Sequence, residues 1–167
     1  TQALIQKQEQ ADKPEDLDKI PRLTREDLTT ETSVKEINVS ELFEGTIFNH
    51  ADEFTSGIDY LNLYFDISDF KQADYEALGF LSNLLGSLPT ERYSVAELQT
   101  QIDLNTGGIH ANVVVYDDPK TKETKPYLVI SGKTLEESFD ALLVLMQEVL
   151  CHTKWNATED ILKLTQS

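Results

Sequence analysis

The segment from Ser94 to Ser131 constrains the fold most, because its hydrophobic period changes from that of a helix to that of a strand. It opens with Ser94-Val95-Ala96-Glu97, a capping box in which the serine hydroxyl and the glutamate carboxylate each accept a backbone N–H of the other residue. Apolar residues then follow at helical spacing: Val95, Leu98, Ile102 and Leu104. The sequence therefore predicts an amphipathic helix that begins after Ser94.

Two glycines end this helix and start a strand. Gly107 and Gly108 both permit the positive φ that the chain needs to leave a helix and extend at once. From Ile109 the pattern alternates, with Ile109, Ala111, Val113 and Val115 on one face and His110, Asn112, Val114 and Tyr116 on the other. A polar reversal over 117–123 precedes a β-branched and aromatic run over 127–130. We expect two antiparallel strands.

The clearest single strand covers residues 58–67. Leu61, Leu63, Phe65 and Ile67 alternate there with Tyr60, Asn62, Tyr64 and Asp66. The aliphatic face should meet helices, whereas the half-polar face suits water or a wet cavity.

The remaining periodic segments supply two helices and two weaker strands. A helix over 72–88 has a stripe at Ala77, Leu78, Leu81, Leu84, Leu85 and Leu88, and Pro89 ends it. A second capping box, Thr134-Leu135-Glu136-Glu137, opens a helix with a stripe at Leu135, Phe139, Leu142, Leu143, Met146, Val149 and Leu150. Short strands are expected near 34–42 and 45–50. This order predicts an α+β sandwich, an antiparallel β-sheet covered on one face by helices.

Several motifs resemble those of one enzyme family. The segment 93–113 resembles the helix-to-strand corner of pitrilysin/insulinase-type zinc metallopeptidases, in the presequence-protease (falcilysin-like) branch, where it has the form y-s-x-x-e-L-x-x-x-I-x-x-x-T-G-G-I. Three further stretches keep the family's order: Ile20-Pro21-Arg22-Leu23 with Asp27, Thr55-Ser56-Gly57-Ile58-Asp59-Tyr60 with Tyr64-Phe65-Asp66, and the strand from Leu128 to Lys133. Together they cover most of the chain.

The resemblance implies a non-catalytic, insulinase-like α+β unit from the start of the second half of such a peptidase. Residues 1–20 would be the end of the inter-half linker helix and linker, and residues 21–167 a peptidase-associated domain cut short at its C-terminal end. The whole enzyme would be a zinc-dependent hydrolase of unstructured peptides held between its halves. This domain would form chamber wall and pack against other domains of the same polypeptide. The implied location is the bacterial cytoplasm, or an organellar matrix in a eukaryote.

Charge and cysteine content narrow the partners. The net charge is −16, and residues 37–167 carry −13 of it, so the acidity belongs to the folded part. Nucleic acid is not an expected partner, because binding it depends on neutralising phosphates. Basic peptides are electrostatically favoured, although an acidic surface can also serve solubility alone. The single cysteine, Cys151, excludes an intrachain disulfide and is expected to be a buried, inert thiol in a reducing compartment. The longest apolar run, 141–146, is too short to span a membrane.

Motifs for catalysis or metal binding are missing. The family's zinc motif, His-x-x-Glu-His, does not occur, and the nearest match, His50-Ala51-Asp52-Glu53-Phe54, has phenylalanine where the second histidine should be. An autonomous metalloenzyme using His50 and Glu53 would need a further ligand that the sequence does not offer. We assign no catalytic, cofactor-binding or metal-binding residue in this chain, and the resemblance assigns the zinc to the parent enzyme.

Six residues are candidates for facing the substrate chamber: Tyr60, Asn62, Tyr64, Asp66, His110 and Asn112. They would form hydrogen bonds with peptides and attract basic ones, without making or breaking bonds. Two alternatives stay open: these residues are ordinary sheet surface, or the chain is a stand-alone acidic protein- or peptide-interaction domain with no enzymatic role.

Overall fold

The computed structural model describes residues 36–118 and 120–166, together with positions 2, 5, 15, 19 and 23–27. The chain divides into two compact units, Thr1–Glu53 and Phe54–Ser167, and each is described by itself. The expected linker helix and the expected domain boundary at residue 20 fall largely outside the described residues.

The first unit contains a β-hairpin of β1 (Asn38–Phe43) and β2 (Thr46–His50). The turn between them depends on Gly45, whose φ of 78° is in the left-handed region that favours glycine. Its N–H donates to the Glu41 carboxylate at 3.0 Å. The two short strands expected in this part of the sequence are confirmed.

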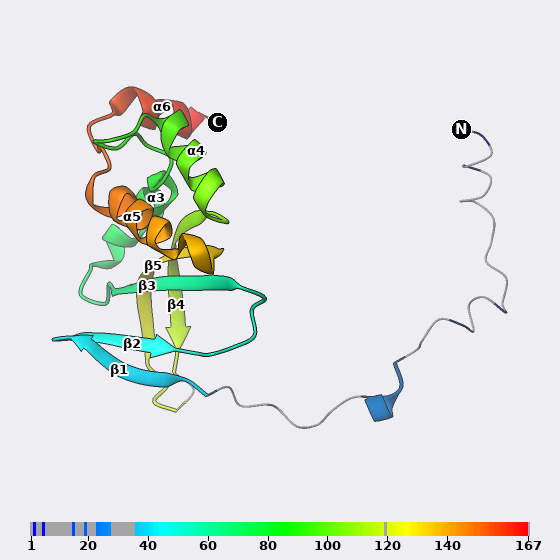
Figure 1. Ribbon diagram of the computed structural model, residues 1–167. Helices are drawn as coiled ribbons and strands as arrows, with labels where there is room; N and C mark the ends of the chain where they lie inside the picture. The colour runs from blue at the N-terminus through cyan, green and yellow to red at the C-terminus, as the bar shows by residue number, and fades with distance from the viewer. Residues whose placement is uncertain are drawn as a thin grey trace. The chain divides into compact units, whose positions relative to one another are not determined.

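The second unit is built on a three-stranded antiparallel sheet of β3 (Ile58–Asp66), β4 (Ile109–Asp117) and β5 (Thr124–Leu135), in the order β3-β5-β4 (Figure 1). The last strand in the sequence lies in the middle, because it pairs with β4 through a short turn and with β3 on its other side. Ile130 is opposite both Leu63 and Ala111, and it is completely buried. Alternation in all three strands therefore directs aliphatic residues to one face.

Helices cover that aliphatic face. They are α3 (Gln72–Leu84), α4 (Val95–Asn105) and α5 (Phe139–Cys151), seen on one side of the sheet in Figure 1, and α6 (Thr158–Gln166) follows at the end of the chain. Leu142 and Met146 of α5 pack on Ile130 and Ala111 of the sheet. Leu145 and Val149, three positions along in each case, pack on Leu98 and Ile102 of α4. The predicted α+β class, with an antiparallel sheet covered on one face, is confirmed.

Two helix boundaries differ from the prediction. The helix predicted over 72–88 ends at Leu84, because the chain turns at Gly86 with a φ of 81°, three residues before Pro89. The predicted capping box at Thr134 is wrong. Thr134 belongs to β5 and its hydroxyl donates to the Asn105 carbonyl oxygen at 2.8 Å, while a 3₁₀ turn (Glu136–Ser138) leads into α5.

Parts of the predicted stripes are also wrong. Leu104 is 75% exposed, and Ala77, Leu81, Leu135 and Leu143 are exposed as well. Leu145 and the polar residues Ser82 and Glu148 are buried instead. The buried side of each helix is shifted from the one that spacing predicts, because the neighbouring elements decide which arc of the helix is covered.

Candidate functional site

The face of the sheet opposite the helices carries all six predicted candidates. Asn62 and His110 both lie opposite Ser131, and Tyr64 and Asn112 both lie opposite Val129. Directly paired residues of antiparallel strands point to the same side, so these rows share one face. Tyr60 and Asp66 belong to it by the two-residue period of β3. We call this surface the open sheet face: Tyr60, Asn62, Tyr64, Asp66, His110, Asn112, Tyr116, Lys125 and Tyr127. All but Tyr127 are exposed, and that residue is half-buried.

Three tyrosines from three strands meet on the open sheet face. The ring centroids of Tyr64, Tyr116 and Tyr127 are 6.0 to 6.1 Å apart, and the rings of Tyr64 and Tyr127 are perpendicular at 89°. Edge-to-face contacts of this kind are favourable for aromatic pairs. Burial raises the pKa of Tyr64, and a hydrogen bond with the Tyr116 hydroxyl raises it further. The three rings therefore support one another as a fixed cluster.

The sequence interpretation did not include Tyr116 and Tyr127 among the candidates. Register explains the omission, because Tyr116 is opposite Lys125, and Tyr127 is two residues further along β5 on the same face. The length of the turn between β4 and β5 was the signal that could have identified them, since it fixes which residues pair.

An acidic pocket of about 370 Å³ adjoins the tyrosines at the β4–β5 turn, and its lining is Tyr116, Asp117, Asp118, Glu123, Lys125 and Tyr127. Hydrogen bonds from the N–H groups of Lys120 and Thr121 lower the pKa of Asp118. Those from Ser68, whose N–H donates at 2.8 Å, lower the pKa of Asp66. Both carboxylates are therefore ionised at neutral pH, and the pocket has three acidic side chains for one basic side chain.

The glycine corner shapes the other end of the open sheet face. A Cβ atom at Gly107 would lie 2.8 Å from Lys133 Cγ, and one at Gly108 would lie 2.8 Å from His110 Nε2. The His110 ring thus lies over the glycine backbone. Of the two glycines, Gly108 has the positive φ, 112°, so Gly107 is required for space and not for an unusual φ.

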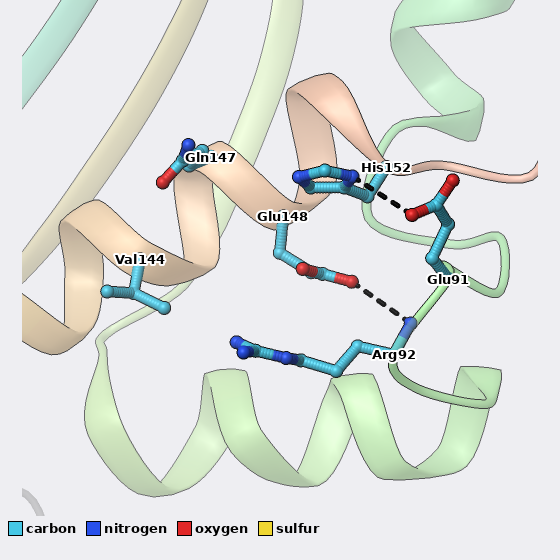
Figure 2. Close-up of a pocket in the computed structure, with 6 residues that line it drawn as sticks. All are labelled: Glu91, Arg92, Val144, Gln147, Glu148 and His152. Atoms are coloured by element: carbon cyan, nitrogen blue, oxygen red, sulfur yellow. Dashed lines mark hydrogen bonds and ion pairs between the residues drawn. The ribbon is translucent and has the colours of Figure 1, made fainter.

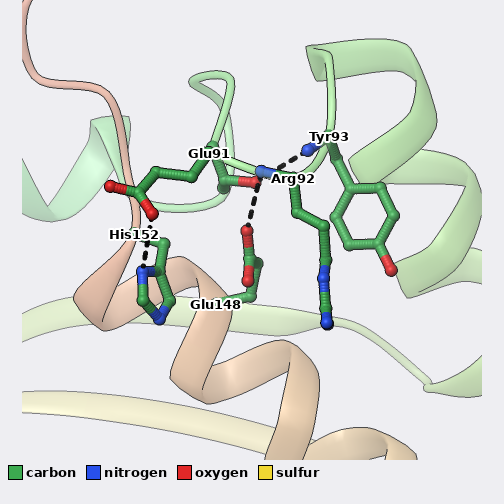
Figure 3. A network of polar contacts seen from close by, with 6 residues as sticks. Glu91, Arg92, Tyr93, Glu148 and His152 are labelled. Carbon is green, nitrogen blue, oxygen red and sulfur yellow. Dashed lines mark hydrogen bonds and ion pairs between the residues drawn. The ribbon is translucent and has the colours of Figure 1, made fainter.

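A second pocket, of about 410 Å³, lies between α5 and the loop before α4 (Figure 2). Glu148 is only 6% exposed, and its carboxylate accepts the Arg92 N–H at 3.2 Å. Beside it the Glu91 carboxylate is 3.3 Å from His152 Nδ1, and the Glu91 N–H donates to the His152 carbonyl oxygen (Figure 3). These contacts, with the antiparallel bridge of Thr90 and Thr153, attach the loop to the end of α5. This pocket is a joint between elements.

The described residues do not provide a metal site. Among them, no group of three His, Cys, Asp or Glu side chains is placed to hold a metal ion. His50 ends β2, where its ring stacks on Phe48 with centroids 6.1 Å apart. The residues described therefore do not fit the zinc ion that the family resemblance implies for the parent enzyme. Cys151 is exposed, so the expectation of a buried thiol is wrong.

The described part of the chain contains no helix that is both long and apolar enough to cross a bilayer.

Comparison with known proteins identifies the family. The whole chain, residues 1–167, matches the family model for the associated domain of M16 peptidases, subfamily C. It is 31% identical over 162 residues to protein HypA of Clostridium perfringens, and the match covers 96% of this chain and 16% of that protein. It is 30% identical over 160 residues to the mitochondrial presequence protease of Saccharomyces cerevisiae, covering 94% and 16%. A mitochondrial presequence protease of Candida albicans is 28% identical over 146 residues, covering 86% and 14%.

The chain thus spans about a sixth of the length of these relatives. The predicted resemblance to the peptidase-associated domain of the presequence-protease branch is confirmed, and the chain belongs to the family of domains associated with M16 peptidases of subfamily C.

Proposed function

We propose that this chain is the non-catalytic domain of a zinc-dependent metalloendopeptidase and that its open sheet face contacts unstructured peptide substrates. Three findings support the proposal. The chain matches the associated family over its whole length, it covers about a sixth of relatives named presequence protease, and its described residues gather no metal ligands. Zinc and the hydrolytic step would belong to other parts of a longer polypeptide.

The observation that carries the proposal is the composition of the open sheet face. Helices already cover the aliphatic face, so a ligand has access to a surface of amides, tyrosines and carboxylates instead. Asn62 and Asn112 can each donate to and accept from an extended backbone, because an amide side chain has both functions. Tyr60 and Tyr64 offer flat apolar area, being 61% and 53% exposed. Such a surface can hold a peptide without reacting with it.

The β1–β2 hairpin supplies a second kind of contact in this proposal. Its large apolar side chains are exposed, with Val39 at 68%, Phe43 at 64% and Ile47 at 70%. Apolar side chains gathered in this way are typical of a surface that another protein part covers. We assign that role to other domains of the same polypeptide, in a reducing compartment such as the bacterial cytoplasm or an organellar matrix.

Peptide binding can be tested on the chain itself by NMR. The ¹⁵N-labelled protein is titrated with an unstructured basic peptide and with an acidic peptide of equal length. We expect the basic peptide to shift the amide signals of Asn62, Tyr64 and Asn112, and the acidic peptide to shift them much less. Asn62→Ala should weaken binding, whereas Leu104→Ala, an exposed position on α4, should not. Shifts restricted to the helices, or none at all, would contradict the proposal.

Two further observations test the enzymatic context. A His-x-x-Glu-His motif upstream in the same reading frame supports a domain of a longer peptidase. A start codon and a stop codon next to the two ends of this sequence would instead favour the stand-alone interaction domain. Cleavage of a fluorogenic peptide by the purified chain, sensitive to chelators, would refute the non-catalytic assignment.

A further inference from the structure

We propose that the tyrosine cluster and the acidic pocket beside it bind the side chain of an arginine or lysine in an extended peptide, and that Lys125 competes for this position. We call the site the basic-residue subsite and define it by Tyr64, Tyr116, Tyr127, Asp66 and the pocket carboxylates Asp117, Asp118 and Glu123. The inference rests on the proposed function for the origin of the peptide, but the chemistry of the subsite is tested separately below.

The aromatic side of the subsite is accessible and fixed. Tyr64 is 53% exposed and Tyr116 is 48% exposed, although their rings contact each other and Tyr127. Because the rings of Tyr64 and Tyr127 are perpendicular, the cluster presents ring faces in two directions. A cation within about 6 Å of such a ring centroid is attracted by the negative ring face. The cluster is therefore a preformed surface for a cationic group.

The acidic side of the subsite has the complementary charge. Asp66 lies directly opposite Tyr127 on the open sheet face, and Asp117 and Asp118 follow Tyr116 at the end of β4. Among the hydrogen bonds of the described residues, those that hold Asp66 and Asp118 all end on Oδ1. Oδ2 of each carboxylate remains available to accept a charge-assisted hydrogen bond from a guanidinium or ammonium group.

Lys125 is the cation already present. It lines the same pocket and lies opposite Tyr116 on the open sheet face. Its charge contributes to the lowered pKa values of both Asp66 and Asp118, after the hydrogen bonds that are the main causes. A tethered ammonium group between these carboxylates weakens the attraction for an incoming cation of the same kind. Removal of Lys125 should therefore strengthen binding.

Arginine should be preferred to lysine at this subsite. A guanidinium group is planar, stacks on aromatic rings and can make two parallel hydrogen bonds with one carboxylate, whereas an ammonium group is a compact, strongly hydrated charge. The subsite offers both an exposed tyrosine ring and carboxylate oxygens, so it matches the guanidinium group more completely.

The test compares an unstructured peptide containing one arginine with the same peptide containing citrulline, which has the same shape but no charge. In an NMR titration of the chain, the arginine peptide should shift the signals of Tyr64, Asp66 and Tyr116 and bind at least about fivefold more tightly than the citrulline peptide. The preference should decrease at about 1 M salt, because exposed charges are screened.

Matched variants assign the effect to the subsite. Tyr116→Phe keeps the ring and should retain binding, whereas Tyr116→Leu keeps apolar bulk, loses the ring and should weaken binding of the arginine peptide about two- to fivefold. Lys125→Ala should strengthen it, and Lys154→Ala, the same charge change away from the subsite, should not do so to the same extent. Unchanged amide dispersion verifies that each variant is folded.

The outcomes separate this inference from the proposed function. If the two peptides bind the open sheet face equally, or Tyr116→Leu has no effect, the subsite is refuted while peptide contact stands. If arginine amide alone shifts the tyrosine signals and no peptide binds the rest of the face, the subsite stands and the proposed function fails. If Lys125→Ala and Lys154→Ala have equal effects, the competing role of Lys125 is refuted.

Discussion

Gly132 of β5 lies directly against Leu142 of α5, and a Cβ atom at Gly132 would be only 2.7 Å from Leu142 Cδ1. The same atom would be 3.4 Å from Met146 Sδ. Leu142 and Met146 are 0% and 2% exposed, so neither side chain has space to move aside. The missing side chain at Gly132 therefore sets how closely the helix layer approaches the central strand.

Gly132→Ala should lower the free energy of unfolding by about 1–3 kcal/mol, because an added methyl group overpacks a filled core. Urea denaturation measures the change. The matched control is Gly79→Ala on α3, where a Cβ atom meets nothing within 4 Å. That variant should be more stable by up to about 1 kcal/mol, because alanine loses less backbone entropy on folding. Equal denaturation midpoints for the two variants would contradict this interpretation.

Ser94→Ala should destabilise the start of α4. The Ser94 hydroxyl accepts the Glu97 N–H at 3.4 Å, and the Glu97 carboxylate accepts the Ser94 N–H at 2.9 Å. Loss of a serine N-cap costs about 1 kcal/mol. Hydrogen exchange should accelerate in the first turn of α4 above all. Thr100→Ala in the middle of the same helix is the control, and its unfolding free energy should not decrease.

The stability of the chain should fall in acid. Hydrogen bonds hold the pKa of Glu97, Asp66 and Asp118 below the ordinary values of these side chains. A lowered folded-state pKa contributes stability that is complete above the unfolded-state pKa, about 4 for these residues, and is lost as the pH falls through the folded-state value. Denaturation midpoints measured from about pH 6 to about pH 2 should decrease mainly below about pH 4. In Ser94→Ala the decrease should be smaller, and an unchanged decrease would show that Glu97 contributes nothing to it.

Glu148→Ala should be more damaging than Glu148→Gln. The buried carboxylate accepts the Arg92 N–H, and a glutamine carbonyl oxygen can accept the same bond. Alanine would leave that N–H unpaired, at a cost of about 1–3 kcal/mol where the group stays buried. Hydrogen exchange of the Arg92 amide reports directly on the bond. If both variants exchange alike at Arg92, the hydrogen bond is not what attaches the loop to α5.

Chelation should leave the thermal midpoint of this chain unchanged, since its described residues gather no metal ligands. Calorimetry with and without EDTA, together with elemental analysis for zinc, measures this. A stoichiometric zinc ion whose removal lowers the midpoint would refute it.

The local parts of the fold were predictable because their causes are local. The capping box at Ser94 and the alternation in β3 and β4 depend on residues that are neighbours in sequence, and both are confirmed. The same alternation is enough to place Tyr60, Asn62, Tyr64 and Asp66 on one face of a strand. Their role as a peptide surface stays a prediction.

The failures have tertiary causes. Thr134 has the sequence of an N-cap, yet its hydroxyl donates to the Asn105 carbonyl oxygen, because β5 continues through it beside the end of α4. Leu81 belongs to a helical stripe but is 39% exposed, because the neighbouring elements cover a different arc of α3. Neither contact partner is close in sequence, so no local pattern could indicate it.

The sequence by itself determined which segments are helices and strands, which strand faces are aliphatic, and which family the chain resembles. Only the tertiary structure decided that β5 lies between β3 and β4, and this placement joins Tyr64, Tyr116 and Tyr127 in one cluster beside Asp66. The reason is physical. Period and capping are set by backbone geometry within a few residues, whereas a surface built from three strands depends on the register between segments that are far apart in the sequence.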